Sequence, residues 1–154
     1  MKSAKQLESL RIGVAGEHLV VAQMNLRGWD ASLTEKNYPM IDIFGRNPQT
    51  GQFVSVQVKS SSPKANSFLI GFNHNNRHEM EDTVMGPYVF VHFNDELTAD
   101  FYILSKKEFI ELVNRTDDIY FNKPRRTPIK DNYPIDVKIH DLAPYKDAWE
   151  NLWK

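Results

Sequence analysis

The sequence contains no cysteine, and this absence removes several classes of chemistry at once. Disulfide bridges, thiol nucleophiles and metal sites built from cysteine are excluded. Long apolar runs are also missing, because the longest have four residues, as at Leu19–Ala22, far fewer than a membrane span needs. The first residues form no apolar stretch of the kind found in secretory signals. We therefore expect a cytoplasmic protein that does not associate with membranes.

A strong excess of charge of one sign is absent as well. The chain has 19 Lys+Arg and 20 Asp+Glu, so its formal net charge is -1. A protein that is basic over its whole surface is excluded, although a local basic groove is not. The length of 154 residues, with 41% hydrophobic and 25% charged residues, is ordinary for one globular domain. We predict a single domain over residues 1–154.

Proline is missing before Pro39, which leaves room for a long helix at the beginning of the chain. Ser3 and Gln6 have the spacing of a capping box, in which each side chain bonds the backbone amide of the other residue. The predicted helix runs from about Ala4 to Arg27, with Gly28 in the usual stop position. Apolar residues follow two sides of this helix. We therefore expect it to lie at the centre of the fold, packed on both sides.

After this helix the pattern changes to short alternating segments and turns. A turn cluster near residues 48–50 joins two segments into a predicted hairpin. The predicted strands are 31–34, 40–44, 53–59, 67–72, 88–93, 101–104 and 135–139, and further helices begin at Asn76, at Ser105 (to about Asn114) and near Tyr145. Residues 117–133 are predicted to form a long polar loop. This order of elements indicates an α/β sandwich.

Glu17 is a carboxylate where the helical pattern calls for an apolar residue. It lies seven residues from both Leu10 and Met24, which places it in the middle of one apolar stripe. Burying a carboxylate costs free energy unless a positive or hydrogen-bonding group meets it. Glu17 is therefore a candidate site residue. An ion pair, or a gap in the stripe where the helix reaches solvent, would explain it equally well.

The predicted hairpin carries three further polar residues. Alternation along Phe53–Lys59 places three valines on one face and Gln57 and Lys59 on the other. If the turn centres near residues 48–50, Asp42 pairs with Gln57 and shares that face. The alternative is a solvent-facing side of a half-exposed hairpin.

Together, Glu17, Asp42 and the run Gln57-Val58-Lys59 resemble the motif of the PD-(D/E)xK nucleases, the restriction-endonuclease-like superfamily that includes archaeal Holliday-junction resolvases. The resemblance implies an α/β fold with an αβββαβ core and a mixed central sheet flanked by helices. It also implies hydrolysis of phosphodiester bonds in nucleic acid, with DNA as the expected substrate. Small members often act as homodimers, because cutting a duplex needs two sites. The sequence departs from the family at Gln57, where most members carry Glu or Asp.

The resemblance implies roles for these residues that match the chemistry. Mg²⁺ (or Mn²⁺) prefers oxygen ligands, and Asp42, Gln57 and Glu17 would supply them. Lys59 would orient the attacking water and offset charge that develops on the phosphate. A nuclease-fold module that binds nucleic acid or a protein without catalysis is the alternative, because Gln57 replaces an acid.

Contacts with the nucleic-acid backbone are expected from two places in the chain. The Ser60 and Ser61 hydroxyls follow the motif directly, and Arg125 and Arg126 belong to a basic stretch of the predicted polar loop. In both places an ordinary solvated loop is the alternative.

Overall fold

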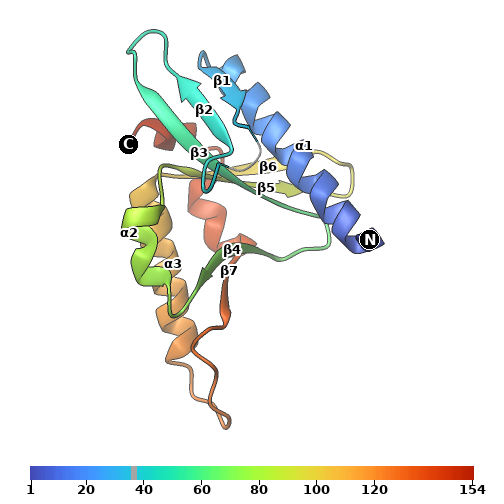
Figure 1. Ribbon diagram of the computed structural model, residues 1–154, viewed down its shortest axis with the longest axis vertical. Helices are drawn as coiled ribbons and strands as arrows, with labels where there is room; N and C mark the ends of the chain where they lie inside the picture. Colours follow the sequence, from blue (N-terminus) through green and yellow to red (C-terminus); the bar gives the residue numbers. More distant parts are fainter. Residues whose placement is uncertain (36–37) are drawn as a thin grey trace.

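The computed structural model describes residues 1–35 and 38–154 and shows a central β-sheet with helices on both faces (Figure 1). Its helices are α1 (Ala4–Leu26), α2 (Met80–Thr83) and α3 (Lys106–Phe121), with 3-10 helices η1 (Arg77–Glu79), η2 (Ile139–Tyr145) and η3 (Trp149–Trp153). Its strands are β1 (Asp30–Leu33), β2 (Ile43–Arg46), β3 (Phe53–Ser61), β4 (Ser67–Asn73), β5 (Tyr88–Phe93), β6 (Ala99–Leu104) and β7 (Pro134–Lys138).

Five strands form the main sheet in the order β1-β2-β3-β5-β6, and β4 pairs with β7 in a separate ribbon. β3 and β5 run parallel, whereas the other neighbours in the main sheet are antiparallel. Parallel neighbours need a crossover, and here β4, η1 and α2 provide it. The order α1, β1, β2, β3, α2, β5 confirms the predicted α/β class with an αβββαβ core and a mixed sheet flanked by helices.

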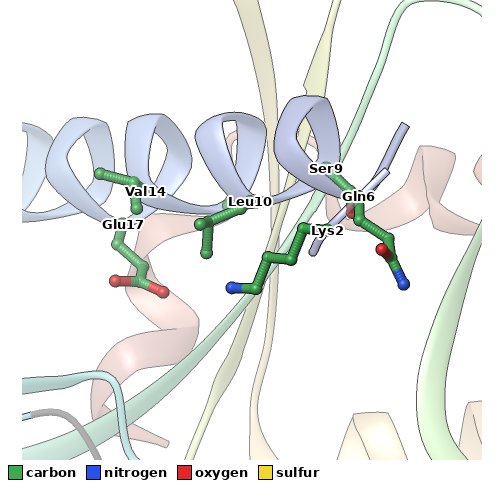
Figure 2. Close-up of a pocket in the computed structure, with 7 residues that line it drawn as sticks. Lys2, Gln6, Ser9, Leu10, Val14 and Glu17 are labelled. Atoms are coloured by element: carbon green, nitrogen blue, oxygen red, sulfur yellow. The ribbon is translucent and has the colours of Figure 1, made fainter. Parts of the chain in front are cut away.

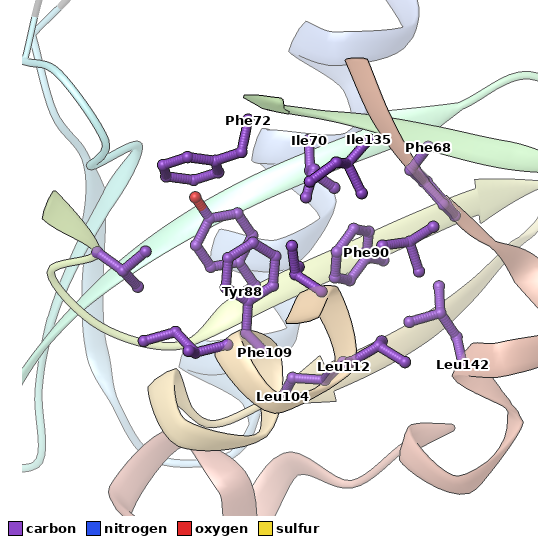
Figure 3. Packing of buried hydrophobic residues seen from close by; sticks show 14 of the residues in the cluster. Phe68, Ile70, Phe72, Tyr88, Phe90, Leu104, Phe109, Leu112, Ile135 and Leu142 are labelled. Atoms are coloured by element: carbon purple, nitrogen blue, oxygen red, sulfur yellow. The ribbon is translucent and has the colours of Figure 1, made fainter. Parts of the chain in front are cut away.

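The two faces of the sheet have separate cores. One contains the β3 valines together with Val20 and Met24 of α1. The other contains Tyr88 and Phe90 of β5, packed against α3, β4 and β7 (Figure 3). Because side chains alternate along a strand, successive residues of β5 belong to opposite cores, and successive residues of β3 face opposite sides of the sheet.

The predicted packing of the first helix on two sides is wrong. Its capping box forms as expected, and Gly28, with φ +86°, follows its end. Only Gly16, Val20 and Met24 are buried, however, so α1 lies on one face of the sheet instead of at the centre. Leu10, in the same stripe as Met24, and Leu26, in the other stripe, are exposed. The sequence pattern gives a helix with apolar residues on two sides, but the sheet covers only one of them.

Two elements in the first half of the chain differ from prediction. β2 begins at Ile43 instead of at residue 40, because Met40 adopts a left-handed φ of 65° that is incompatible with an extended strand. In place of the helix predicted to begin at Asn76, the crossover has the short η1 and α2, and the Asn76 side chain accepts a hydrogen bond from the Asn73 amide instead of capping a helix.

The second half of the chain differs mainly at residue 117. α3 continues to Phe121, so the first part of the predicted loop is helical. Asp117 is fully buried there and accepts hydrogen bonds from Arg77 and Tyr133, with His74 Nδ1 2.6 Å from its Oδ2. The end of the chain forms 3-10 turns instead of one helix, because Pro144 and a positive φ at Asp147 interrupt it.

None of the helices within residues 1–35 and 38–154 is long and apolar enough to span a bilayer.

Candidate functional site

Asp42 directly precedes β2, and backbone hydrogen bonds hold it to β3 on one side and to the segment after β1 on the other. Its amide donates to the Val56 carbonyl at 2.9 Å, and its carbonyl accepts from the Thr34 amide at 2.9 Å. The register pairs Ile43 with Val56, so Asp42 lies opposite Gln57, as the sequence predicts.

The Asp42 side chain also forms hydrogen bonds with β3. Its Oδ2 accepts hydrogen bonds from the Gln57 side-chain amide and, at 2.7 Å, from the Val58 backbone amide. Both donors meet the same oxygen. The hydrogen bonds found in the described chain therefore leave Oδ1 available for another partner.

The protonation of Asp42 reflects a balance of burial and polar contacts. Burial raises the pKa of Asp42 above its usual value, while the Val58 amide, the Lys59 charge and the Gln57 amide each lower it. Burial prevails, so the ionised carboxylate is less stable here than in water. A cation that reached Oδ1 would relieve this cost.

Gln57 is buried, with only 8% of its surface exposed, so its face of β3 is not a solvent-facing side of a half-exposed hairpin. α3 and the β4–β7 ribbon lie on this side of the sheet. The Gln57 amide nitrogen bonds Asp42, but its Oε1 has no hydrogen-bond partner among residues 1–35 and 38–154. A buried oxygen without a donor costs roughly 1–3 kcal/mol, so Oε1 is also available for a ligand.

Lys59 follows two residues later and shares the face of Gln57. Its charge lowers the pKa of Asp42, which shows that the two groups lie within electrostatic reach. Lys59 is half-buried and also lines a hollow between β3 and α1. The structure therefore brings Asp42, Gln57 and Lys59 together.

Tyr88 joins this group, and sequence reasoning missed it. It pairs with Gln57 across β3 and β5, and its ring stacks on Phe109 at 3.7 Å (Figure 3). Its buried hydroxyl has no hydrogen-bond partner in the described structure. Burial and the charge of Asp42 raise the pKa of Tyr88, so the hydroxyl stays protonated and can donate. Its only sequence signal is a tyrosine at the beginning of a strand that is mostly apolar.

Glu17 occupies a different position. α1 packs on the valine face of β3, because Val20 and Met24 share a core with the β3 valines, whereas Gln57 and Lys59 rise from the opposite face. The half-buried Glu17 extends into a hollow of about 390 Å³ that Lys2 also lines (Figure 2). β2 pairs with β3 only as far as Val56, so the edge of β3 beyond Val56 has no neighbouring strand on that side. The Glu17 carboxylate would have to reach around this edge to approach Asp42. Its role in the site stays a prediction.

The four residues expected to contact nucleic acid fall in two separate places. Ser60 and Ser61 line the same hollow as Lys59, and the Ser61 hydroxyl lies 2.8 Å from His92 Nδ1. Arg125 and Arg126 belong to the loop after α3, at the opposite end of the molecule from the β2–β3 hairpin (Figure 1). Arg125 stacks on Tyr120 at 4.4 Å and bonds backbone carbonyls, which engages its guanidinium locally.

The donor set suits a hard divalent cation more than zinc. No group of three or more His, Asp or Glu residues that could hold a metal occurs within the part of the chain that the structure describes. The Asp42 carboxylate and the unbonded Gln57 Oε1 are oxygen ligands of the kind that Mg²⁺ accepts together with water and phosphate. The residues therefore fit a Mg²⁺ ion that binds with few protein ligands.

Comparisons with known proteins give a structural likeness only. No protein-family model matches the sequence, and no curated protein matches it. The solved structure of a bacterial homing endonuclease, I-Ssp6803I, is similar to this chain over 97% of this chain and 91% of that chain. The sequence identity is 17% and the TM-score is 0.47.

Proposed function

We propose that this protein is a metal-dependent nuclease that hydrolyses phosphodiester bonds, with DNA as its substrate. The observation that carries the proposal is the contact of Asp42 with Gln57 beside Lys59, which assembles the second half of the PD-(D/E)xK motif. The buried Gln57 Oε1, which has no hydrogen-bond donor among residues 1–35 and 38–154, supports a cation ligand at this position.

In this proposal Asp42 and Gln57 hold Mg²⁺ or Mn²⁺, and Glu17 is a third ligand, direct or through water. The bound ion would polarise the phosphate and lower the pKa of a water molecule. The protein's own part is to hold the Asp42 carboxylate rigid through the Val58 amide and to present Gln57 Oε1 beside it. Gln57 contributes no charge, so the scissile phosphate would supply the missing anionic ligand.

Lys59 acts on the substrate side of the site. As the cation on the same face of β3, it orients the attacking water and offsets charge on the phosphate. Its position on β3, two residues after Gln57, and its partial exposure support this role, because a bound strand could reach the amine.

The proposal is tested by incubating the purified protein with linear, supercoiled and branched DNA, and with RNA, in Mg²⁺ or Mn²⁺ and in EDTA. Asp42→Ala and Lys59→Ala should each abolish metal-dependent cleavage while circular dichroism shows a folded protein. Lys107→Ala is the matched control, because Lys107 is exposed and lies on α3, away from Asp42. Glu17→Gln separates the predicted third ligand from a residue of α1 without a role in cleavage.

Cleavage that survives both Asp42→Ala and Lys59→Ala would remove this site assignment. Nucleic-acid binding by the wild type without cleavage in either metal would favour the second candidate, a non-catalytic binding module. The observation that favours this candidate is Gln57, whose amide donates to Asp42 where an acid would share the metal.

A further inference from the structure

A hollow lies between α1 and the end of β3. It has a volume of about 650 Å³. The last residues of β3 form one side, the first half of α1 forms another, and the segment leading into β4 forms the third. Lys59 lines this hollow and also belongs to the face of β3 that carries Gln57, so the hollow adjoins the candidate site at this residue.

The charge of this hollow differs from that of the whole molecule. Three lysines line it, Lys5, Lys59 and Lys64, against one carboxylate, Glu8. The protein as a whole has a formal net charge of -1. Positive charge is therefore concentrated here, in a molecule that is otherwise slightly acidic.

These lysines differ from three others of the fold in their partners. Lys107, Lys138 and Lys146 each lie within 4.0 Å of a carboxylate oxygen. Within the described residues, no ion pair of this kind involves Lys5, Lys59 or Lys64. Their ammonium groups are free to bind an external anion.

The remaining lining is rich in hydroxyls. Ser9, Ser60, Ser61, Ser62 and Ser67 all contribute to it. The Ser60 hydroxyl is buried and has no hydrogen-bond partner in the part of the chain that the structure describes. Lysine and serine are typical contacts to phosphate oxygens, which position a strand without reading its sequence.

We infer that this hollow is the track of a phosphodiester backbone, with Lys5 and Lys64 binding phosphates next to the one held beside Lys59. The inference rests on the proposed function for its direction, because the strand then leads from the cleaved phosphate along the end of β3. It assigns Lys5 and Lys64, which the sequence motif does not mark, and it predicts binding that depends little on base sequence.

The test measures binding in EDTA, so that no strand is cut, by fluorescence anisotropy over a range of salt concentrations. The probes are a labelled DNA duplex, the single DNA strand and an RNA of the same sequence. Lys5→Gln and Lys64→Gln should each weaken binding about three- to tenfold near 0.1 M salt. Each should also reduce the slope of log K against log salt by about one. The three probes distinguish DNA from RNA as the source of the backbone.

Lys107→Gln is the control, because it removes the same charge from the exposed surface of α3. A double variant of Lys5 and Lys64 that matches this control in affinity and salt slope would overturn the inference. So would a wild-type protein that binds none of the three probes. Binding that is weakened by Lys5→Gln and Lys64→Gln, without cleavage in Mg²⁺, would support the backbone track and contradict the proposed nuclease activity. Cleavage that neither substitution affects would contradict the track alone.

Discussion

Asp42 is the residue on which the candidate site depends, and its environment favours the neutral acid. Burial raises its pKa above the usual 3.8 in the folded protein, despite three interactions that lower it. A raised carboxyl pKa adds stability below the unfolded-state pKa, and this contribution is lost as the pH rises through the folded-state pKa. At neutral pH the ionised Asp42 therefore destabilises the free protein.

We predict that Asp42→Asn is more stable than the wild type at pH 7 and loses this advantage in acid. The asparagine carbonyl can accept both hydrogen bonds that now meet at Oδ2, so the substitution removes the charge and keeps the contacts. Urea unfolding of both proteins between pH 3 and pH 8 measures the difference. Parallel pH profiles would show that Asp42 does not carry this cost.

Gln57 gives a second prediction at the same scale, because it is the position where the family motif is changed. Gln57→Glu adds a charge to a buried group bonded to Asp42, so the two carboxylates repel each other without metal. We expect a lower melting temperature in EDTA and a larger rise with added Mn²⁺ than the wild type shows. Gln49→Glu, in the exposed turn, adds the same charge and should change neither.

Calorimetric titration with Mn²⁺ gives the corresponding affinities. Equal Mn²⁺ affinity of the wild type and Gln57→Glu would mean that residue 57 does not contact the metal.

At the scale of elements, the close packing of α1 on the sheet depends on Gly16. A Cβ at this position would lie 1.9 Å from the Ser60 hydroxyl and 3.0 Å from Ser60 Cβ. The helix can therefore approach β3 closely only because residue 16 has no side chain. This contact also sets where the adjacent Glu17 lies relative to β3.

Gly16→Ala should therefore destabilise the protein by about 1–3 kcal/mol, although alanine is the better helix former. Gly13→Ala in the same helix is the control. A Cβ there meets nothing within 4 Å, so we expect it to stabilise by up to about 1 kcal/mol. Thermal or urea unfolding measures both, and Ser60→Gly should recover part of the loss in the Gly16→Ala background. Equal stabilisation by Gly16→Ala and Gly13→Ala would show that α1 does not pack closely against Ser60.

At the scale of the whole molecule, the sequence predicts local structure better than it predicts which surfaces are covered. The hairpin register that joins Asp42 to Gln57 follows from the turn near residues 48–50 and from alternation along β3. Periodicity cannot show whether a second layer packs on a face. For this reason Gln57 is buried where an open face was one interpretation, and Leu10 is exposed where packing was expected.

The same limit explains what was missed. Asp117 is buried because residues distant in sequence, Arg77 and Tyr133, converge on it, and no local pattern records that convergence. Tyr88 belongs to the site because it lies beside Gln57 across a parallel pair. The strands of that pair are separated by a long crossover, so their register is not fixed by any turn.

Gln57 Oε1 and the Tyr88 hydroxyl, two of the buried polar atoms without a hydrogen-bond partner among residues 1–35 and 38–154, have a consequence for selection. Substitutions that remove them, such as Tyr88→Phe, keep the packing on Phe109 and should raise the stability of the free protein. A library enriched only for resistance to heat or protease would then accumulate changes at residues 42, 57 and 88 and lose the site. If the proposed function is what retains these residues, a stability screen without any substrate should favour their replacement.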